Sequence, residues 1–557
     1  MKTFRILVAH APRDVASAGI LGLAAGLGTA AMLALANSAI SDPAQRTAAG
    51  GLQFLAVVTV VLIATAGSQI VLVRLAQGIV LDLQHRLLRA ILAAPLPALE
   101  RIGNPRLLAA LTADVNAVSR AAPWIAGLWV NAVGLLGCLA YLAWLSPSLL
   151  AVLFGVLVAG GFVYRVLMMR GFSWIRAAHR ARDDLYRHFR SVTEGLKELK
   201  IHQHWRERFA GHVFRTDAQR FRDARVRGTS IFALTGAWGV TLFFLAIGAL
   251  VYVAPGVTAV DDAILMKYAV TILFMITPLR GLLNSVPEVG QANVALDRIE
   301  ALDLDLDAAP STTQSVAAHA APTFHTITLE GVRFRFPQGD GEDTPFELGP
   351  IDFTLRAGER VFLVGGNGSG KSTLAKVLTG LYPIAGGRIL VDGQPVDAAD
   401  GPNDGGRMDD YRAHFSGVFA EGFVFDELLG PSPEEPSANG EVQRLLERLE
   451  LTRRVRVEGR RFSTTALSTG QRKRLGLLAT CLEPRPVYVF DEWAAEQDPR
   501  FKEVFYRELL PELARQGKTV VAITHDDRYF DGADRVVRLD EGKIVEDEAV
   551  TVAGRAP

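Results

Sequence analysis

The sequence predicts a multidomain protein, in which an all-α domain of six transmembrane helices precedes an α/β domain. Three observations support this fold class. The chain has 557 residues, which is long for a single domain. Its mean hydropathy of +0.21 is high for a soluble protein, because long apolar runs fill the first half. The second half instead alternates short buried strands with helical segments.

Six apolar stretches reach the roughly twenty residues that a helix needs to cross a bilayer. Each must be helical, because lipid offers no partner for backbone polar groups. The spans run from Val15 to Ile40, Leu52 to Leu75, Ala122 to Leu145, Leu149 to Met169, Ile231 to Val253 and Ala263 to Val286. The basic N-terminus before the first span resembles a signal peptide, but the spans that follow favour a retained first helix.

The connections between spans indicate the orientation. The segment after the second span and the segment from Arg170 to Arg227 are long and rich in arginine, whereas the other connections are short. By the positive-inside rule, the long segments and both termini are cytoplasmic. Apolar periodicity continues into these segments, so we expect the helices to extend beyond the membrane. Lys+Arg and Asp+Glu both total 59, which argues against a nucleic-acid partner.

Few polar residues lie within the spans, and such residues usually face a bundle interior or a water-filled path. Asn131, Arg280 and Asn284 are therefore candidates for a substrate cavity. Arg280 either meets an anionic group of a cargo molecule or pairs with an acid such as Glu288. The two cysteines lie in different halves of the chain, so we expect neither a disulfide nor a cysteine metal site.

The second half begins after a small, polar, non-periodic stretch at residues 303–323, which predicts a linker. The expected domains are thus 1–302 and 324–557. In the second domain, a buried strand leads into Gly365-Gly-Asn-Gly-Ser-Gly-Lys-Ser372, which fits a phosphate loop between a strand and a helix. Its glycines allow backbone N–H groups to face phosphates. Lys371 reaches the β and γ phosphates, and Ser372 offers a hydroxyl to Mg²⁺. This predicts an α/β P-loop nucleotide-binding domain.

Two further strands end in polar residues. The strand at residues 486–490 is followed by Asp491 and Glu492, and the strand at residues 520–523 is followed by His525. Beside a phosphate loop, Asp491 can hold Mg²⁺ and Glu492 can orient or deprotonate the attacking water. Two acids after a strand are weak evidence for a hydrolytic site when they occur alone. They are strong evidence when the same chain has a phosphate loop with Lys371. A lone histidine is more often structural, yet the end of a parallel strand is where such sheets bind ligands.

Leu467-Ser-Thr-Gly-Gln471 resembles the signature loop of ATP-binding cassette proteins. With the phosphate loop, the two acids and His525 in this order, nearly the whole chain resembles a type IV exporter half. The resemblance implies that Phe336 stacks on adenine, that His525 senses the γ-phosphate, and that Asp498 lies in a dimer-contact loop. It implies the following nucleotide-binding residues: Phe336, Gly365, Gly366, Asn367, Gly368, Ser369, Gly370, Lys371, Ser372, Thr373, Ser468, Gly470, Gln471 and Asp498.

Three departures from the family pattern narrow the subfamily. Ala420 stands where the family has a glutamine that touches Mg²⁺, and Glu421 follows it; either water or Glu421 then completes the metal site. Thr469 replaces the commoner glycine, and Trp493 to Phe501 replaces the usual sequence after the acids. The combination is similar to bacterial cyclic peptide and siderophore-precursor exporters. These motifs lie in the ATPase, so they indicate cargo only by association.

The resemblance implies an ATP- and Mg²⁺-dependent exporter that works by alternating access in the bacterial inner membrane. Because one chain carries one cassette and intact motifs, a homodimer with two competent sites is expected. Its partners would be a second copy, membrane lipid and a peptide or siderophore cargo. A lipid flippase shares this architecture and is the first alternative. A membrane-bound ATP sensor that does not pump is the second, although Glu492 argues against it.

Overall fold

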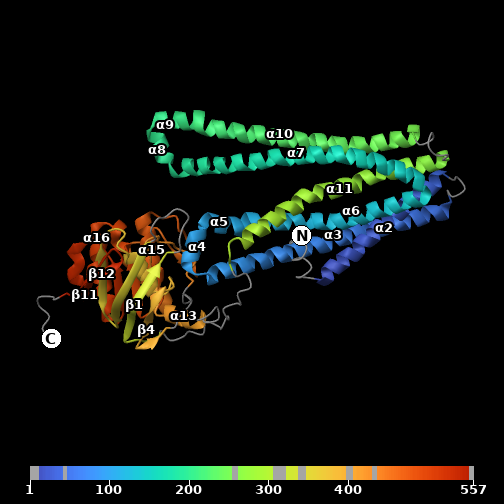
Figure 1. The fold of residues 1–557 in the computed structure, drawn as a ribbon. Helices are drawn as coiled ribbons and strands as arrows, with labels where there is room; N and C mark the ends of the chain where they lie inside the picture. Colours follow the sequence, from blue (N-terminus) through green and yellow to red (C-terminus); the bar gives the residue numbers. More distant parts are fainter. Residues whose placement is uncertain are drawn as a thin grey trace. The chain divides into compact units, whose positions relative to one another are not determined.

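The computed structural model describes residues 12–41, 47–253, 261–304, 322–336, 346–396, 405–429 and 436–550. Contacts divide the chain into two units (Figure 1). The helical unit comprises Met1–His85 and Ala109–Asp303, and the sheet unit comprises Arg86–Leu108 and Leu304–Pro557. The sequence-based division had placed residues 86–108 with the membrane domain. Most of the linker expected at residues 303–323 lies outside the described residues.

Within the described residues, six helices are long and apolar enough to cross a membrane. The main helices are α2 (Pro12–Ser41), α3 (Ala48–Ala93), α6 (Val115–Leu145), α7 (Pro147–Glu194), α10 (Arg215–Gly248) and α11 (Asp262–Glu300). The shorter elements are α5 (Asn104–Ala109), η2 (Ala110–Asp114), α8 (Leu196–Ile201), α9 (Gln203–Arg208), η3 (Phe209–Phe214) and η4 (Ala249–Val253). With these short elements included, five of the six candidate spans are between 39 and 51 residues long. The predicted extension of the helices beyond bilayer length is therefore confirmed.

Small residues bring the helices of this unit close together. Helix α7 runs along α10, and α6 packs against both α2 and α11 (Figure 1). A Cβ at Gly160 would lie only 2.1 Å from Leu242 Cδ1, so a larger residue there would require Leu242 to shift where α7 approaches α10. At the same place, the indole N–H of Trp238 donates to the Gly160 carbonyl at 3.0 Å. The α7–α10 pair is thus held by close backbone contact and by an interhelical hydrogen bond.

The sheet unit contains two main sheets in its described part. One has the order β2-β1-β4-β5 and is antiparallel. The other has the order β12-β11-β3-β10-β9-β6, with parallel pairing from β11 to β6. The strands of the two main sheets are β1 (Thr326–Arg335), β2 (Glu347–Arg356), β3 (Arg360–Gly365), β4 (Gly386–Val391), β5 (Gln394–Pro395), β6 (Phe415–Val418), β9 (Val487–Asp491), β10 (Thr519–Ile523), β11 (Arg535–Asp540) and β12 (Lys543–Ala549). Strands β7 (Val457–Glu458) and β8 (Arg461–Phe462) form a separate small hairpin.

Helices cover the parallel strands, and both faces are apolar. Phe362 and Val364 of β3 belong to one core cluster, whereas Val361 and Leu363 belong to the other. This alternation explains why the strand reads as a continuous apolar run in the sequence. The helical elements are α4 (Leu96–Ile102), α12 (Lys371–Leu378), α13 (Gly405–Arg412), α14 (Pro436–Arg448), α15 (Thr469–Cys481), η6 (Trp493–Glu496), α16 (Pro499–Glu503), η7 (Val504–Leu509), α17 (Leu510–Arg515) and η8 (Asp527–Gly532).

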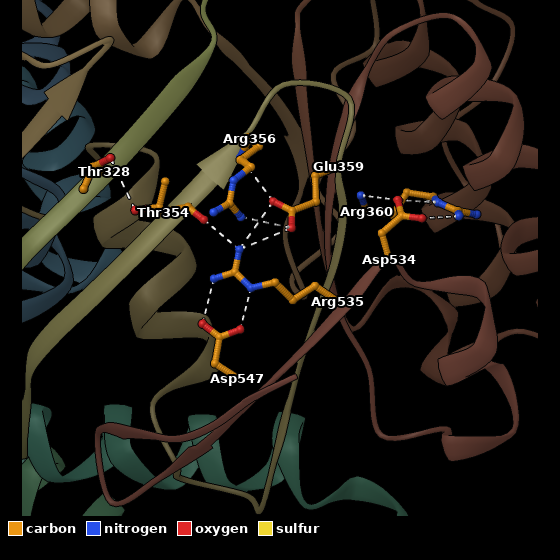
Figure 2. Close-up of polar contacts among 8 residues, drawn as sticks. All are labelled: Thr328, Thr354, Arg356, Glu359, Arg360, Asp534, Arg535 and Asp547. Atoms are coloured by element: carbon orange, nitrogen blue, oxygen red, sulfur yellow. Dashed lines mark hydrogen bonds and ion pairs between the residues drawn. The ribbon is translucent and has the colours of Figure 1, made fainter. Parts of the chain in front are cut away.

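A polar network joins the two sheets, and Figure 2 shows it. The Arg535 side chain on β11 is only 11% exposed. It donates to the Thr354 carbonyl of β2 at 2.7 Å, to Glu359 at 3.3 Å and to Asp547 of β12 at 2.7 Å. Its guanidinium also lies over the Phe353 ring, at 5.1 Å from the centroid. One buried cation therefore binds three separate stretches of chain.

We expect Arg535→Met to lower the free energy of unfolding by about 3 kcal/mol, because it leaves Asp547 without its cation and leaves the partly buried Glu359 with only the longer, 4.0 Å pair to Arg356. The measurement is thermal unfolding of the full-length protein. Arg538→Met is the matched control, since Arg538 lies on the same strand and its partner Glu546 is about half exposed; its cost should stay below about 1 kcal/mol. Equal unfolding temperatures for the two variants would contradict this role of Arg535.

Candidate nucleotide site

The phosphate loop connects the end of β3 to the start of α12. Gly365 and Gly370 have φ values of +146° and +99°, which L side chains rarely adopt. A Cβ at Gly365 would lie 2.2 Å from the Leu539 carbonyl oxygen. Glycine at these positions is therefore required by the turn itself, which directs the chain into the N-terminus of α12. This geometry matches the loop that the sequence predicted between a strand and a helix.

Lys371 is the first residue of α12 and is 5% exposed. Its ammonium donates to the carbonyls of Gly366 at 2.7 Å and Gly365 at 3.2 Å, so it lies across the loop. Burial lowers the pKa of Lys371, whereas the negative charges of Glu492 and Asp491 act in the opposite direction. The loop therefore contains a buried cation beside two acids, at the position where phosphates would bind.

Ser372 and Asp491 lie side by side. The Ser372 hydroxyl donates to Asp491 Oδ1 at 2.9 Å, and Asp491 is 2% exposed. Burial raises the pKa of Asp491, and the charges of Glu492 and Glu421 raise it further. A buried carboxylate next to a hydroxyl is a fitting pair of oxygen ligands for Mg²⁺, because a bound dication would offset the cost of burying the charge.

Glu492 follows Asp491 in an unusual backbone conformation. Its φ of +48° and ψ of +32° lie in the left-handed region, where a non-glycine residue is uncommon. Glu492 Oε1 is 3.1 Å from His525 Nε2. The Lys473 ammonium donates to the Glu492 carbonyl at 3.4 Å. The structure thus brings together the two residues that the sequence proposed as catalytic, from the ends of neighbouring strands β9 and β10.

Lys371, Ser372 and Glu492 border a cavity of about 420 Å³. It is lined by Phe336, Phe346, Asn367, Gly368, Gly370, Lys371, Ser372, Thr373 and Glu492. Phe336 packs against Tyr382 with the ring centroids 5.8 Å apart and the planes nearly perpendicular. The predicted adenine-stacking aromatic therefore lies at the same cavity as the phosphate loop. Phe346, which the sequence analysis did not single out, adds a second aromatic wall.

The signature residues do not line this cavity in the described part of the chain. Ser468 is the N-cap of α15: its hydroxyl accepts from Gln471 N at 3.4 Å, and the Gln471 side chain accepts from Ser468 N at 3.4 Å. Gly470 lies against the loop after Glu492, where a Cβ would be 3.3 Å from the Glu496 carbonyl. Ser468, Gly470 and Gln471 therefore form one end of a helix that is separate from the phosphate loop.

Asp498 caps α16 and binds the signature helix. It accepts from Phe501 N at 3.1 Å and from Arg474 Nη2 at 2.7 Å. The Arg474 guanidinium also lies 3.2 Å from the centre of the Phe501 ring. Although burial acts to raise the pKa of Asp498, these hydrogen bonds and the charge of Arg474 hold it below the usual value. The structure gives Asp498 a positioning contact that the family resemblance did not suggest.

Trp493 is the main residue of this region whose role sequence reasoning missed. It is 2% exposed, stacks on Phe505 at 4.5 Å, and donates from its indole N–H to the Lys473 carbonyl at 2.8 Å. It therefore fixes the residue after Glu492 to the signature helix α15. The departure of this stretch from the family pattern was visible in the sequence, but its contacts with Phe505 and Lys473 depend on how the neighbouring helices pack against it.

The helical unit has a cavity of about 1260 Å³ between α6, α7, α10 and α11. Arg280 and Asn284, two of the residues that the sequence analysis suggested for a substrate cavity, line it. The Asn131 side chain does not line it; instead, it lies against α11, where a Cβ at Gly281 would be 2.2 Å from Asn131 Nδ2. No carboxylate among the described residues is within ion-pair distance of Arg280, so the alternative pairing with Glu288 is not formed.

Comparisons with known proteins agree with this architecture. Residues 18–277 match the ABC transporter transmembrane region, and residues 348–495 match the ABC transporter family. The chain is 35% identical over 553 residues to the ATP-binding protein SyrD of Pseudomonas syringae pv. syringae, covering 96% of this chain and 94% of that protein. It is 26% identical over 493 residues to an ATP-dependent lipid A-core flippase of Alkalilimnicola ehrlichii, covering 84% and 79%. The solved structure of a bacterial Atm1-family ABC exporter with ATP bound matches with a TM-score of 0.72 at 19% identity, covering 97% and 96%.

Six apolar helices followed by an α/β unit with a phosphate loop define a multi-pass membrane protein that hydrolyses ATP to drive transport. The chain belongs to the ABC transporter family and has the exporter fold. The sequence-based fold class, the family and the ATPase activity are thereby confirmed.

Glu421 lies close enough to Asp491 for its charge to raise the pKa of that acid, although Ala420 itself offers no ligand. If Glu421 helps to complete a metal site, Glu421→Ala should raise the Mg²⁺ concentration needed for half-maximal ATPase activity by roughly tenfold. Glu427→Ala is the control. Glu421 and Glu427 line one surface cavity of about 460 Å³, but Glu427 pairs with Arg461. Unchanged Mg²⁺ affinity together with unchanged transport would rule out this role.

Proposed function

We propose that this protein is an exporter that moves a peptide-type cargo, such as a cyclic peptide, lipopeptide or peptide siderophore precursor, across the bacterial inner membrane as a homodimer. The observation that carries the ATP-driven part is the contact between Glu492 and His525 beside Lys371. The peptide part is supported by the signature and post-acid motifs, which are similar to those of cyclic peptide and siderophore-precursor exporters. The sheet unit and both termini would be cytoplasmic, in accordance with the arginine-rich segments.

In the proposed reaction, Glu492 accepts a proton from the water that attacks the γ-phosphate, and His525 holds the Glu492 carboxylate in place and contacts that phosphate. Lys371 and the backbone N–H groups of the loop bind the phosphate chain. Ser372 and Asp491 would hold Mg²⁺, which neutralises phosphate charge when it is bound. Glu492, whose backbone is in the left-handed region, lines the cavity beside Lys371.

The division of the site supports dimerisation. The cavity at the phosphate loop is lined by Phe336, Phe346, Glu492 and residues of the phosphate loop and α12. Within the described chain, Ser468 and Gly470 do not contribute to it. A second copy would supply these residues, so that ATP is enclosed between two sheet units. Nucleotide then favours the closed state because only that state makes contacts from both sides.

Helix α4 supports coupling between the membrane segments and ATP binding. It belongs to the sheet unit, where Glu100 accepts from Lys376 Nζ at 3.0 Å and from the Tyr382 hydroxyl at 2.6 Å. Burial, together with the bond to Glu100, raises the pKa of Tyr382 to about 12. Tyr382 in turn packs on Phe336. We infer a path from α4 to the aromatic wall of the nucleotide cavity.

A lipid flippase is the second candidate, because lipid A-core flippases are among the relatives that align over most of the chain. A non-pumping sensor is disfavoured by the intact arrangement of Glu492, His525 and Lys371. Flippase and peptide exporter differ in what stimulates ATP hydrolysis, so the same assay separates them.

We expect Glu492→Gln to reduce ATP hydrolysis by about 100-fold to 10,000-fold while ATP binding is retained, since only the general base is removed. The measurement is ATPase rate in lipid nanodiscs, with cyclic peptides, peptide siderophores and lipid A as possible stimulators. Glu503→Gln is the control, because Glu503 is an exposed acid on α16 that does not line the phosphate-loop cavity. Stimulation by lipid alone would favour the flippase, and a wild type that never hydrolyses ATP would favour the sensor.

Glu100→Gln should leave basal ATPase activity intact and reduce cargo-stimulated activity by roughly two- to fivefold, because the charge that pairs with Lys376 is lost at a half-exposed site. Arg101→Gln on the same helix is the control. The ratio of stimulated to basal rate is the quantity to compare. An unaltered ratio in Glu100→Gln would show that this contact does not transmit the cargo signal.

A further inference from the structure

The cavity of the helical unit has an unbalanced charge. Its volume of about 1260 Å³ exceeds the roughly 300–1,000 Å³ of most small-molecule sites. One aspartate, Asp114, lines it. Six arginines line it: Arg120, Arg176, Arg182, Arg225, Arg280 and Arg298. Such an excess of one sign in a concave, partly apolar space attracts and concentrates molecules of the opposite charge.

The described part of the chain supplies few carboxylates that pair with these arginines. Asp114 is 3.5 Å from Arg298. Across the ranges that the structure describes, no other ion pair joins a carboxylate to any of the remaining five arginines. Arg182 gives the clearest sign of a missing partner, because its Nε atom is buried and has no hydrogen-bond acceptor among the described residues. A buried donor on a charged group is costly unless an acceptor satisfies it, and an anionic ligand would be such an acceptor.

The lining arginines of α7 and α10 lie at one end of this cavity, and the opposite end is apolar. Helices α7 and α10 pack together so that Gly228 meets Ile175 and Gly160 meets Leu242. They therefore run in opposite directions, and the order of lining residues along them can be compared. Arg176 and Arg182 on α7 lie at the same end as Arg225 on α10. The other end is lined by Tyr164, Met168 and Phe172 on α7 and by Val240 and Phe243 on α10.

We propose that this cavity takes an amphipathic anionic cargo, namely an acylated peptide with free carboxylates at one end and an apolar body at the other. The arginine end binds the carboxylates through charge-assisted hydrogen bonds, and the aromatic end receives the apolar body. This inference rests on the proposed peptide-export function and specifies the chemistry of its cargo.

The test measures binding of a fluorescent N-acyl peptide with two aspartates to the full-length protein in phosphatidylcholine nanodiscs, without nucleotide. The matched probe carries asparagine in place of both aspartates. We expect the acidic peptide to bind at least about tenfold more tightly, because each hydrogen bond to a charged group contributes roughly a factor of ten. The difference should shrink as salt concentration rises.

Arg176→Gln/Arg225→Gln should weaken binding of the acidic peptide by roughly tenfold or more and leave the asparagine peptide unchanged. Arg180→Gln/Arg215→Gln is the control, since it removes two positive charges from α7 and α10 outside the cavity lining. Its binding of the acidic peptide should equal that of the wild type. This pattern would not arise from a change in net charge alone.

Equal binding of the two peptides, with no difference between the variant pairs, would overturn the inference. The same binding measurement is made with diphosphoryl lipid A and with its dephosphorylated form. Binding of the diphosphoryl lipid alone would overturn the acylated peptide as cargo and support a flippase. Peptide binding without any stimulation of ATP hydrolysis would support the anion site but contradict the exporter function, so failure of one proposal is distinguishable from failure of the other.

Discussion

The hydrogen bond from Ser372 to Asp491 is the contact on which the nucleotide site depends. It joins the first turn of α12 to the end of β9, although β10 lies between β3 and β9 in the sheet. Holding these ends together places Lys371 and Glu492 at one cavity, and the end of β10 brings His525 to the same edge. The parallel order of the strands thus determines the chemistry, because carboxyl ends of neighbouring strands meet at one side.

Much of this arrangement could be predicted from sequence, because the decisive signals are local. The turn around Gly365, the acids after β9 and the histidine after β10 each follow an apolar strand within a few residues. The contacts that sequence reasoning missed are long-range. Trp493 binds Lys473, and Glu100 binds Tyr382 from 282 residues away. Neither pairing has a period or spacing that a single sequence reveals, since both depend on tertiary packing.

The helical unit shows the same contrast. Hydropathy predicts six spans, because bilayer thickness sets their length. Which polar residues face the cavity depends on helix rotation, which hydropathy leaves open. Arg280 and Asn284 face it, whereas Asn131 is used in packing against Gly281. The sequence analysis used the arginines of this region only to assign orientation, and only the folded arrangement gathers those of α7 and α10 around one cavity.

The assignment of α4 to the sheet unit has a practical consequence for where the chain can be divided. Leu96 packs against the core cluster that includes Phe334 and Tyr382, and Glu100 satisfies both Lys376 and the Tyr382 hydroxyl. A soluble fragment that starts after residue 304 would keep every nucleotide motif yet expose the apolar surface under Leu96. Purified alone, such a fragment would also lack the hydrogen bond from the Tyr382 hydroxyl to Glu100, so its ATPase rate would come from a nucleotide cavity with an altered aromatic wall.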